Sequence, residues 1–583
     1  MKNITTLVAF LLSFTLGSAY ASKEETLVSW QPFNDASQTS AKKGDKLILL
    51  NMEAVWCHWC HVMDQKTYSD PEVADYLAKH FVSAREDSDA RPDLANRYRA
   101  YGWPATIIMK ADGTELVKRA GYIAPENMLQ LLKAVVADPT AEAAASIPSF
   151  KPATNSGFSA GVVAELGRRH INSYDWRRGG LKNAQKYIDA NKLAWSLSQT
   201  TNDNEQAMAK QTLDVAMGLI DPYWGGVYQY STGYDWNRPH FEKLLKIQAR
   251  YMSFYAQGYQ QFSEPSYLEA AELIAMYVAD FLTSPDGGFY SSQDADLLPG
   301  EHSAEFFELD DRERRDKGIP RVDKAIYAAD NGQMISGLLS LHKYSNDKRY
   351  LKRSQKALNS LITERLLPSN GFLHSDNDAG GPWLADSLYM AQAILDMYEV
   401  TGTRTLLEQS VKTANFITDN FKNKSGGYIG SVSSLLSQSP DLEENIDLAR
   451  FFNRLSHYSG MANHGLAVTH AVKFLASPDV ALRRVEETGL LLLNAELHQD
   501  PAHFTVVSEK SDPVGIALFK TANAQPIAYK RVEWWDRSDR KLMNHDVEYP
   551  TFKTAAAYVC SEGRCSVPSF DAASYQRQIS SQQ

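Results

Sequence analysis

Cysteine is scarce in this chain, which has only four among 583 residues. Four cysteines are too few for the disulfide framework of small secreted domains. The fold must therefore depend on hydrophobic cores. After the first 21 residues, no apolar run reaches the roughly 18–20 residues that a membrane-spanning helix needs. Excess positive charge is also absent, because the formal net charge is −10. This charge argues against nucleic acid as a partner.

Residues 1–21 have the composition of a secretory signal peptide. Lys2 supplies positive charge, Leu7–Leu16 is a short apolar segment, and Ala19-Tyr20-Ala21 fits a small-x-small cleavage site. The apolar segment is too short to span a bilayer. We therefore expect a soluble exported protein, cleaved after Ala21 and either periplasmic or secreted.

Two of the four cysteines lie close together in Trp56-Cys57-His58-Trp59-Cys60-His61. The apolar run Leu47–Leu50 before them is typical of a buried strand, and apolar residues at helical spacing follow them. The pair is therefore expected where a strand ends and a helix begins. Because the helix dipole lowers the pKa of a thiol there, Cys57 is predicted to be the exposed nucleophile and Cys60 to resolve a mixed disulfide.

Other interpretations fit the same residues. Cys57 to His61 spells the C-x-x-C-H signature of c-type haem attachment. Cys57, His58, Cys60 and His61 are also possible zinc or copper ligands, and a purely structural disulfide is the simplest alternative. The strand that leads into the motif and the continuing β-α pattern favour a redox-active dithiol. We expect no cofactor and no bound metal.

The motif and its surroundings resemble two families. WCHWCHVM, with DSDARPDLANRY further on, resembles the thioredoxin-like domain of the spermatogenesis-associated, thioredoxin-domain protein family. WCxxCHxMDxxTYSDPEV, ending in GWPATIIMKADGTE, also resembles the periplasmic thioredoxin-like domain of the DsbD-type disulfide reductases. The resemblance implies that Pro104 is the cis-proline that faces the dithiol. Most thioredoxins carry an acid six residues before the first cysteine, where this chain has Asn51, and nearby Glu53 is a candidate substitute.

The predicted reaction is thiol–disulfide exchange. Trp56, His58 and Trp59 adjoin the cysteines and are predicted to tune the dithiol, and a protonated His58 would lower the thiol pKa further. The expected partners are protein thiols or disulfides, or a membrane disulfide reductase.

The first domain is predicted over residues 22–136, with the order of elements of a thioredoxin-like α/β fold. Phe81–Ala84 has the pattern of a strand. Thr106–Met109 and Glu115–Val117 are predicted to form a hairpin around Asp112-Gly113, and Pro125–Val136 to form a closing helix. Residues 137–157, rich in Ala, Pro, Ser and Thr, are the expected linker.

Residues 158–482 show paired helical stripes separated by glycines that precede an aromatic or aliphatic residue. A repeat of this size indicates stacked helical hairpins, and we expect an all-α (α/α) toroid of about six of them. The longest interval holds a charged insertion, Asp294–Lys324, which is predicted to be an exposed loop. The glycine punctuations are Gly179-Gly180-Leu181, Gly225-Gly226-Val227-Tyr228, Gly287-Gly288-Phe289-Tyr290, Gly371-Phe372 and Gly426-Gly427-Tyr428.

A second resemblance covers most of this region. GGVYQYSTGYDWNRPHFEKLL, GGFYSSQDADL and the tail TAAAYVCSEGRC resemble the same spermatogenesis-associated family, whose helical part resembles six-hairpin glycosidases and sugar epimerases. This likeness implies a fold and leaves the activity open, because one fold hosts many functions.

Polar residues after the glycine punctuations are candidates for a pocket at one end of the toroid. Paired acids would suit acid–base chemistry on a sugar, so a carbohydrate-active or sugar-binding protein with an accessory thioredoxin domain is the alternative function. The same residue types also cap helices and fill wide cores. The candidates are Asp235, Trp236, His240, Glu242, Asp294, Asp296 and Asp386.

Residues 483–583 are expected to form a small α/β extension, which makes the chain multidomain. Phe504–Val507, Ala528–Val532 and Ala556–Val559 have the pattern of short strands. Cys560 and Cys565 are expected to pair across a tight turn in an oxidising compartment.

Overall fold

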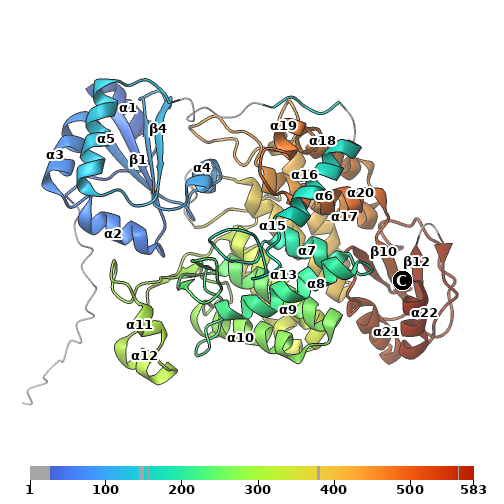
Figure 1. Ribbon diagram of the computed structural model, residues 1–583. Helices are drawn as coiled ribbons and strands as arrows, with labels where there is room; N and C mark the ends of the chain where they lie inside the picture. Colours follow the sequence, from blue (N-terminus) through green and yellow to red (C-terminus); the bar gives the residue numbers. More distant parts are fainter. Residues whose placement is uncertain are drawn as a thin grey trace, which may run out of the picture.

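The computed structural model describes residues 27–142, 150–154, 157–376, 378, 381–561 and 564–582. The predicted signal peptide lies outside these residues, as do 143–149 and 155–156 of the predicted linker. Among the helices that are described, none is both long and apolar enough to cross a bilayer. An N-terminal α/β unit (residues 27–142) rests against a large helical unit, and a smaller C-terminal α/β unit lies on the opposite side (Figure 1).

The N-terminal unit is built on a mixed sheet, four-stranded within the described residues, with the order β2-β1-β3-β4. β1 (Leu47–Glu53) pairs parallel with β2 (Phe81–Asp87) and antiparallel with β3 (Ala105–Met109), and β3 pairs antiparallel with β4 (Glu115–Ala120). The central strand β1 begins with four apolar residues, Leu47–Leu50, and it is buried from Ile48 to Met52, as expected of a strand covered on both faces. These strands lie where the sequence places them.

Helices cover both faces of this sheet. α3 (Pro71–His80) and α5 (Pro125–Ala137) share one hydrophobic core with the sheet, and α1 (Asp35–Gly44) and α4 (Pro92–Tyr98) share the other. α2 (His58–Lys66) follows β1, and the 3-10 helix η1 (Arg99–Tyr101) follows α4. The arrangement confirms the predicted thioredoxin-like α/β architecture.

Helical hairpins form a closed ring, which confirms the predicted toroid. Each inner helix contacts the next, and the last contacts the first. Within the described residues the six inner helices are α7 (Ala190–Ser198), α9 (Leu245–Phe262), α13 (Ala328–Ser345), α15 (Leu384–Thr401), α17 (Leu442–Ser459) and α20 (Thr488–His498). The outer helices that pair with them are α8 (Asp203–Ala216), α10 (Pro265–Phe281), α14 (Lys348–Arg365), α16 (Arg404–Asn420), α18 (Ala462–Leu475) and α6 (Ala160–Asn172). We call this unit the helical ring.

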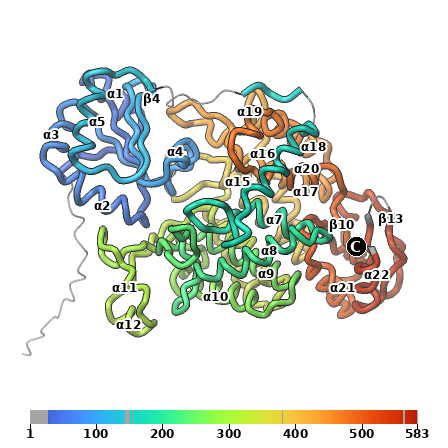
Figure 2. Tube along the Cα trace, viewed as in Figure 1, coloured from blue at the N-terminus to red at the C-terminus, as the bar shows by residue number. Residues whose placement is uncertain are grey.

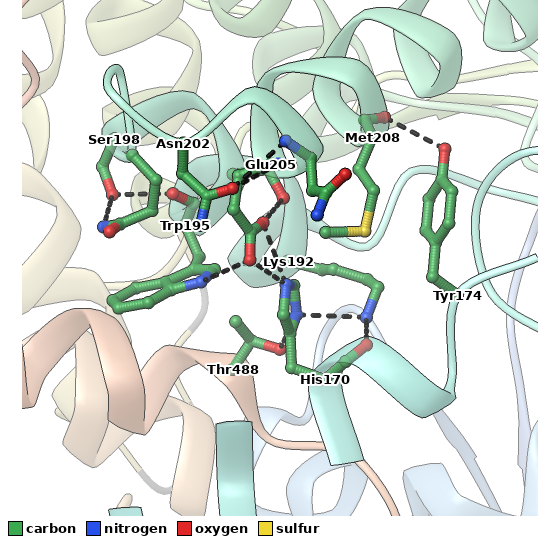
Figure 3. Close-up of polar contacts among 12 residues, drawn as sticks. His170, Tyr174, Lys192, Trp195, Ser198, Asn202, Glu205, Met208 and Thr488 are labelled. Carbon is green, nitrogen blue, oxygen red and sulfur yellow. Dashed lines mark hydrogen bonds and ion pairs between the residues drawn. The ribbon is translucent and has the colours of Figure 1, made fainter. Parts of the chain in front are cut away.

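A buried polar network closes the ring between its first and last helices (Figure 3). His170 of α6 lies with Nε2 3.0 Å from Oε2 of Glu205 in α8. Lys192 of α7 has Nζ 3.1 Å from His170 Nδ1, which is 3.3 Å from the Thr488 hydroxyl at the start of α20. The boundary predicted at residue 482 therefore separates α20 from the ring that it completes.

The glycine punctuations are tight turns that follow the outer helices. A Cβ on Gly226, whose φ is +75°, would lie 2.5 Å from the ring of Tyr277, so glycine is required there. Side chains of the inner helices bind the backbone of these turns. For example, Asn331 of α13 accepts a hydrogen bond from the Phe289 N–H at 2.7 Å and donates one to the Phe289 carbonyl at 2.9 Å. The β-bridges that close the turns are Tyr174–Leu181, Ile220–Val227, Thr283–Phe289, Leu366–Phe372 and Lys422–Tyr428.

The insertion predicted as an exposed loop is folded against the ring, so that prediction was wrong. Arg314 is fully buried, and its Nη1 lies 2.6 Å from Oδ2 of Asp221. The Nζ of buried Lys243 lies 2.7 Å from the same oxygen. The insertion carries α11 (Ala304–Phe307), α12 (Asp311–Lys317) and β9 (Val322–Asp323), and β8 (Ser292–Gln293) directly precedes it. Other short elements nearby or at the ring edge are η3 (Met217–Leu219), β5 (Tyr230–Ser231), β6 (Pro239–His240), β7 (Lys243–Leu244) and α19 (Pro478–Ala481).

The C-terminal unit repeats the strand order and directions of the N-terminal sheet. Its described strands run β11-β10-β12-β13, with β10 and β11 parallel and the remaining pairs antiparallel. The residues after β10 are Ser508-Glu509-Lys510, so the dithiol has no counterpart there. A disulfide instead joins Cys560 and Cys565 on adjacent strands. The elements are β10 (Ala502–Val507), α21 (Pro513–Asn523), β11 (Lys530–Trp535), β12 (Ala556–Ser561), β13 (Arg564–Cys565) and α22 (Ala572–Gln582).

Candidate functional site

Cys57 and Cys60 form a disulfide where β1 leads into α2. Cys57 is the N-cap of α2, and its Sγ accepts a hydrogen bond from the Cys60 N–H at 3.2 Å. A negative charge on this sulfur would be stabilised by that N–H and by the positive end of the helix dipole. The predicted strand-to-helix setting of the dithiol is therefore present.

The prediction that Cys57 is exposed was wrong. Cys57 and Cys60 are each only 4% exposed. Leu244, at the end of β7, lies in one apolar cluster with the two cysteines, and Ile247, in the first turn of α9, packs against this cluster together with Trp103. The helical ring therefore covers the dithiol with apolar side chains from far along the chain.

A cavity of about 790 Å³ lies between the N-terminal unit and the ring, and Cys57 lines it. Sites for small molecules typically have volumes of roughly 300–1,000 Å³. Aromatic residues come from both units, and most of the charged residues come from the ring. Lining residues include Trp56, Trp59, Arg99, Trp103, Tyr230, His240, Glu242, Arg250, Glu443 and Arg484.

The peptide bond between Trp103 and Pro104 is cis, in agreement with the resemblance. Pro104 is buried directly before β3. Its neighbours Gly102 and Trp103 line the cavity beside Cys57. The segment before β3 therefore forms part of the surface that a ligand of Cys57 would meet.

The residues predicted to tune the dithiol have different surroundings. Trp59 is 45% exposed at the cavity, whereas Trp56 is buried and donates from Nε1 to Oδ2 of Asp89 at 2.6 Å. Glu53 has Oε2 3.1 Å from Nε of Arg85 and accepts from the Asn51 amide at 3.1 Å. Glu53 is thus held in an ion pair on the strand that precedes the motif.

An acidic segment after β8 meets the first turn of α2 (Figure 2). Asp296 has Oδ1 2.7 Å from Nδ1 of His58 and Oδ2 3.2 Å from Nδ1 of His61. Asp294 has Oδ2 3.6 Å from Nε2 of His61. Both aspartates are only 2% exposed. The dithiol helix is therefore anchored to the ring by imidazole–carboxylate contacts.

Burial sets unusual pKa values in this segment. Burial raises the pKa of Asp294 to about 6, against the opposing effect of His61. Burial also raises the pKa of Glu242, and with the neighbouring charges of Asp294 and Asp296 the value reaches about 8. For Asp296 the hydrogen bonds from His58 and His61 outweigh burial, and its pKa is lowered.

The seven polar residues proposed for one pocket do not share it. His240 and Glu242 line the cavity, and Asp294 and Asp296 contact the α2 imidazoles instead. The remaining three do not line the cavity, so grouping all seven in one pocket was wrong.

Each of those three residues has a local role. Asp235 lies between β5 and β6, with Oδ2 3.4 Å from Nε of Arg238. Trp236 is a core residue that fills space beside the tight turn at Gly180. Asp386, in the first turn of α15, accepts from the Ala329 N–H at 2.9 Å.

Sequence reasoning missed several contacts between the units. His374 has Nδ1 2.9 Å from Oδ1 of Asp386 and Nε2 2.7 Å from the carbonyl oxygen of Asp89. Arg99 of the N-terminal unit pairs with Asp441 and Glu443 of the ring. Asp89 could have been found, because it follows β2, which runs parallel to β1 and ends at the edge where the dithiol lies.

Comparison with known proteins supports a thiol-related role for the N-terminal unit. Residues 15–138 match the Thioredox_DsbH family model, described as a protein of unknown function, DUF255. Thiol:disulfide interchange protein DsbD 1 of Pseudomonas aeruginosa is 28% identical over 112 residues, 18% of this chain and 19% of the relative.

Other relatives match more of the chain. An uncharacterized protein of Caenorhabditis elegans is 21% identical over 533 residues, 69% of this chain and 73% of the relative. Spermatogenesis-associated protein 20 of Homo sapiens is 29% identical over 310 residues, covering 47% of this chain. The match spans 39% of the human relative's own length.

The similar solved structures include two sugar epimerases. Cellobiose 2-epimerase from Bacillus thermoamylovorans has a TM-score of 0.46 and 11% identity, over 57% of this chain and 98% of that chain. A sugar epimerase from a ruminal bacterium has a TM-score of 0.44 and 15% identity, over 54% of this chain and 86% of that chain. At these scores the likenesses carry no conclusion about activity.

Proposed function

We propose that the protein is an exported thiol–disulfide oxidoreductase that uses the Cys57/Cys60 dithiol, with the helical ring forming the place where the substrate binds. The observation that carries the proposal is the position of Cys57, which caps α2, accepts the Cys60 N–H and lines the cavity. The signal-like residues 1–21 support a location in the periplasm or outside the cell.

The reaction begins in the reduced protein. The Cys57 thiolate attacks one sulfur of a substrate disulfide, which forms a mixed disulfide and releases the other substrate sulfur as a thiolate that takes up a proton. Cys60 then loses its proton and attacks the Cys57 sulfur, which releases the second substrate sulfur as a thiol. The substrate gains two electrons and two protons, and Cys57 and Cys60 become a disulfide. A membrane disulfide reductase is the proposed source of electrons for the next cycle.

Nearby groups favour the thiolate form of Cys57. The Cys60 N–H and the α2 dipole stabilise negative charge on its sulfur. A positive charge on the adjacent His58, held against Asp296 at 2.7 Å, would add to this effect. Because the helix and the Asp296 contact fix these groups in place, they act without reorganisation.

The cover over the dithiol restricts the substrate. Leu244 and Ile247 pack on the cysteines, so a substrate must enter through the cavity unless the two units separate. The cavity volume of about 790 Å³ fits a small disulfide or an extended peptide segment. We therefore propose small or extended disulfides as substrates in preference to folded proteins.

Trapping tests the proposal. In a Cys60→Ser variant the mixed disulfide on Cys57 cannot be resolved, so incubation with a cystine-containing hexapeptide should give a stable adduct, located by mass spectrometry. A Cys560→Ser/Cys565→Ser variant serves as the control and should retain peptide reduction. Absence of any adduct on Cys57 would refute the proposed reaction.

A second candidate function is carbohydrate binding, favoured by the aromatic and carboxylate lining of the cavity. If it is correct, disaccharides should raise the melting temperature of the wild-type protein. Glu242→Gln should abolish that shift, whereas Asp235→Asn, which lies outside the cavity, should leave it unchanged. No shift with a disaccharide panel would remove this candidate.

A further inference from the structure

Two imidazoles and two carboxylates meet where α2 contacts the ring, and Glu242 lies beside them. His61, Asp294 and Asp296 can each direct one ligand atom to a common point, and these atoms lie within 4.8 Å of one another. We propose that this cluster binds a divalent transition-metal ion, with zinc as the expected ion. Water would complete the coordination, and His58, whose Nδ1 lies 2.7 Å from Oδ1 of Asp296, would orient that carboxylate.

The orientation of the His61 ring suits metal binding. Its Nε2 lies 3.2 Å from the carbonyl oxygen of Val55, which can only accept a hydrogen bond. The other ring nitrogen, Nδ1, donates to Oδ2 of Asp296, 3.2 Å away, and a bound metal ion would take the place of that proton. A backbone carbonyl that fixes the tautomer of a ligand histidine is a usual feature around metal ions in proteins.

Glu242 provides a second, independent observation. It is 4% exposed, and its Oε2 has no hydrogen-bond partner among the described residues. An unpartnered carboxylate oxygen is costly to bury. Glu242 makes a hydrogen bond with the backbone of His58, in the first turn of α2, and this contact places its carboxylate beside the cluster. A water molecule on an ion bound at the cluster would give the orphaned oxygen a partner.

Charge also favours a cation. Asp294 and Asp296 bring two buried carboxylates together, and the imidazoles of His58 and His61 are the basic groups in direct contact with them. Nearby Lys243 and Arg314 are already paired with Asp221. A divalent ion that displaced the proton of His61 would balance the charges of the two aspartates.

The donor set indicates which kind of ion. Imidazole nitrogen with carboxylate oxygen suits zinc and other first-row transition ions, whereas calcium and magnesium prefer oxygen donors alone. Cys57 and Cys60 are paired with each other and are not needed as ligands. The ion would join α2 to the segment after β8, and so hold the ring closed over the dithiol.

The decisive experiment uses the wild-type, fully oxidised, full-length protein after treatment with a chelator. In this form both cysteine pairs are closed, so thiols cannot bind the added metal. Titration with zinc chloride should show one saturable site per chain by calorimetry. Mass spectrometry of the metal content should find one zinc per chain, and bound zinc should raise the melting temperature. No saturable site in this titration overturns the proposal.

Variants place the site. Asp294→Asn/Asp296→Asn should weaken zinc binding by about 10–100-fold or more. His61→Gln should weaken zinc binding to a similar extent, and it replaces the double variant in this test if that variant does not fold. Asp316→Asn, an exposed acid of the same insertion, and Cys57→Ser/Cys60→Ser should bind zinc like the wild type. Full binding by His61→Gln, or loss of binding in the cysteine variant, would assign the metal to other residues.

Discussion

His58, which directly follows the first cysteine of the dithiol, has its Nδ1 2.7 Å from Oδ1 of Asp296, a residue 238 positions further along the chain. The second oxygen of Asp296 lies 3.2 Å from His61. The redox motif and the acidic segment of the ring, which the sequence presents as separate candidates, are therefore parts of one site. Any change at Asp296 should affect the helix that carries the cysteines.

Asp296→Asn tests this contact. The substitution keeps the shape of the side chain and removes the charge that both imidazoles face. Because Asp296 is buried, we expect the free energy of unfolding to fall by about 1–3 kcal/mol in urea denaturation. Asp316→Asn is the control, since Asp316 is exposed and 4.0 Å from Arg312, and it should change stability by less than about 0.5 kcal/mol. Equal losses in the two variants would contradict an anchoring role for Asp296.

The cover over Cys57 predicts that its reactivity depends on the size of the reagent. In a Cys560→Ser/Cys565→Ser background with the dithiol reduced, iodoacetamide should modify Cys57 much faster than a maleimide attached to a large polymer. Ile247→Ala removes part of the apolar cover, so the alkylation rates of Cys57 with the two reagents should become more similar. Alkylation rates from mass spectrometry provide the measurement. If the large reagent reacts as fast as iodoacetamide, Cys57 is open in solution.

The local setting of the dithiol could be predicted from the sequence, and its cover could not. Leu47–Leu50 and the residues after Cys57 encode a strand and a helix through short-range patterns, so the position of Cys57 at the helix start followed. Leu244 has the same apolar character whether it faces the interior of the ring or another unit. No periodicity tells these two cases apart.

Closure of the ring is another long-range relationship. α20 follows the charged run Arg483–Glu487, which resembles a domain boundary when only composition is considered. Its role depends on contacts with α7 and α17 that bring distant parts of the chain together. The buried pairing of Arg314 with Asp221 escaped prediction for the same reason, because a charged segment usually indicates an exposed loop.

The Cys560–Cys565 disulfide is predicted to stabilise the protein and to play no part in exchange. It closes a loop of only a few residues, and removing it should lower the free energy of unfolding by about 2 kcal/mol. Unfolding of Cys560→Ser/Cys565→Ser in urea gives this value, and reduction of the cystine peptide should continue at the wild-type rate. A loss of peptide reduction in this variant would show that the second pair carries electrons.

The buried ion pairs of Asp221 predict a large loss of stability when this residue is substituted. Asp221 is fully buried and holds both Lys243 and Arg314, at 2.7 and 2.6 Å. Asp221→Asn leaves two buried cations without a counter-charge, so unfolding should become easier by about 3–5 kcal/mol. Asp280→Asn, an exposed acid on α10, should have little effect. A loss below about 1 kcal/mol for Asp221→Asn would mean that water or another group compensates the cations.

His374 predicts a pH dependence of stability. Burial alone lowers its pKa, but the Asp386 carboxylate and the Asp89 carbonyl raise it more, to about 9. A histidine whose pKa is higher in the folded state stabilises the fold fully below its unfolded pKa of 6.5, and this contribution is lost as the pH rises to about 9. The contribution amounts to about 3 kcal/mol at most.

The measurement compares wild type and His374→Gln by urea denaturation at several pH values between 6 and 10. The wild type should be the more stable at pH 6, and the difference should shrink through the window and nearly vanish at pH 10. Comparison with a variant is needed because Lys243 also changes the stability of the wild type in this range. Burial lowers the pKa of Lys243 to about 8, so its contribution makes the fold more stable as the pH rises, opposite to that of His374. His498→Gln, which changes an exposed histidine, should follow the wild type throughout. A gap between wild type and His374→Gln that stays constant with pH would mean that His374 holds the two units together without a charge.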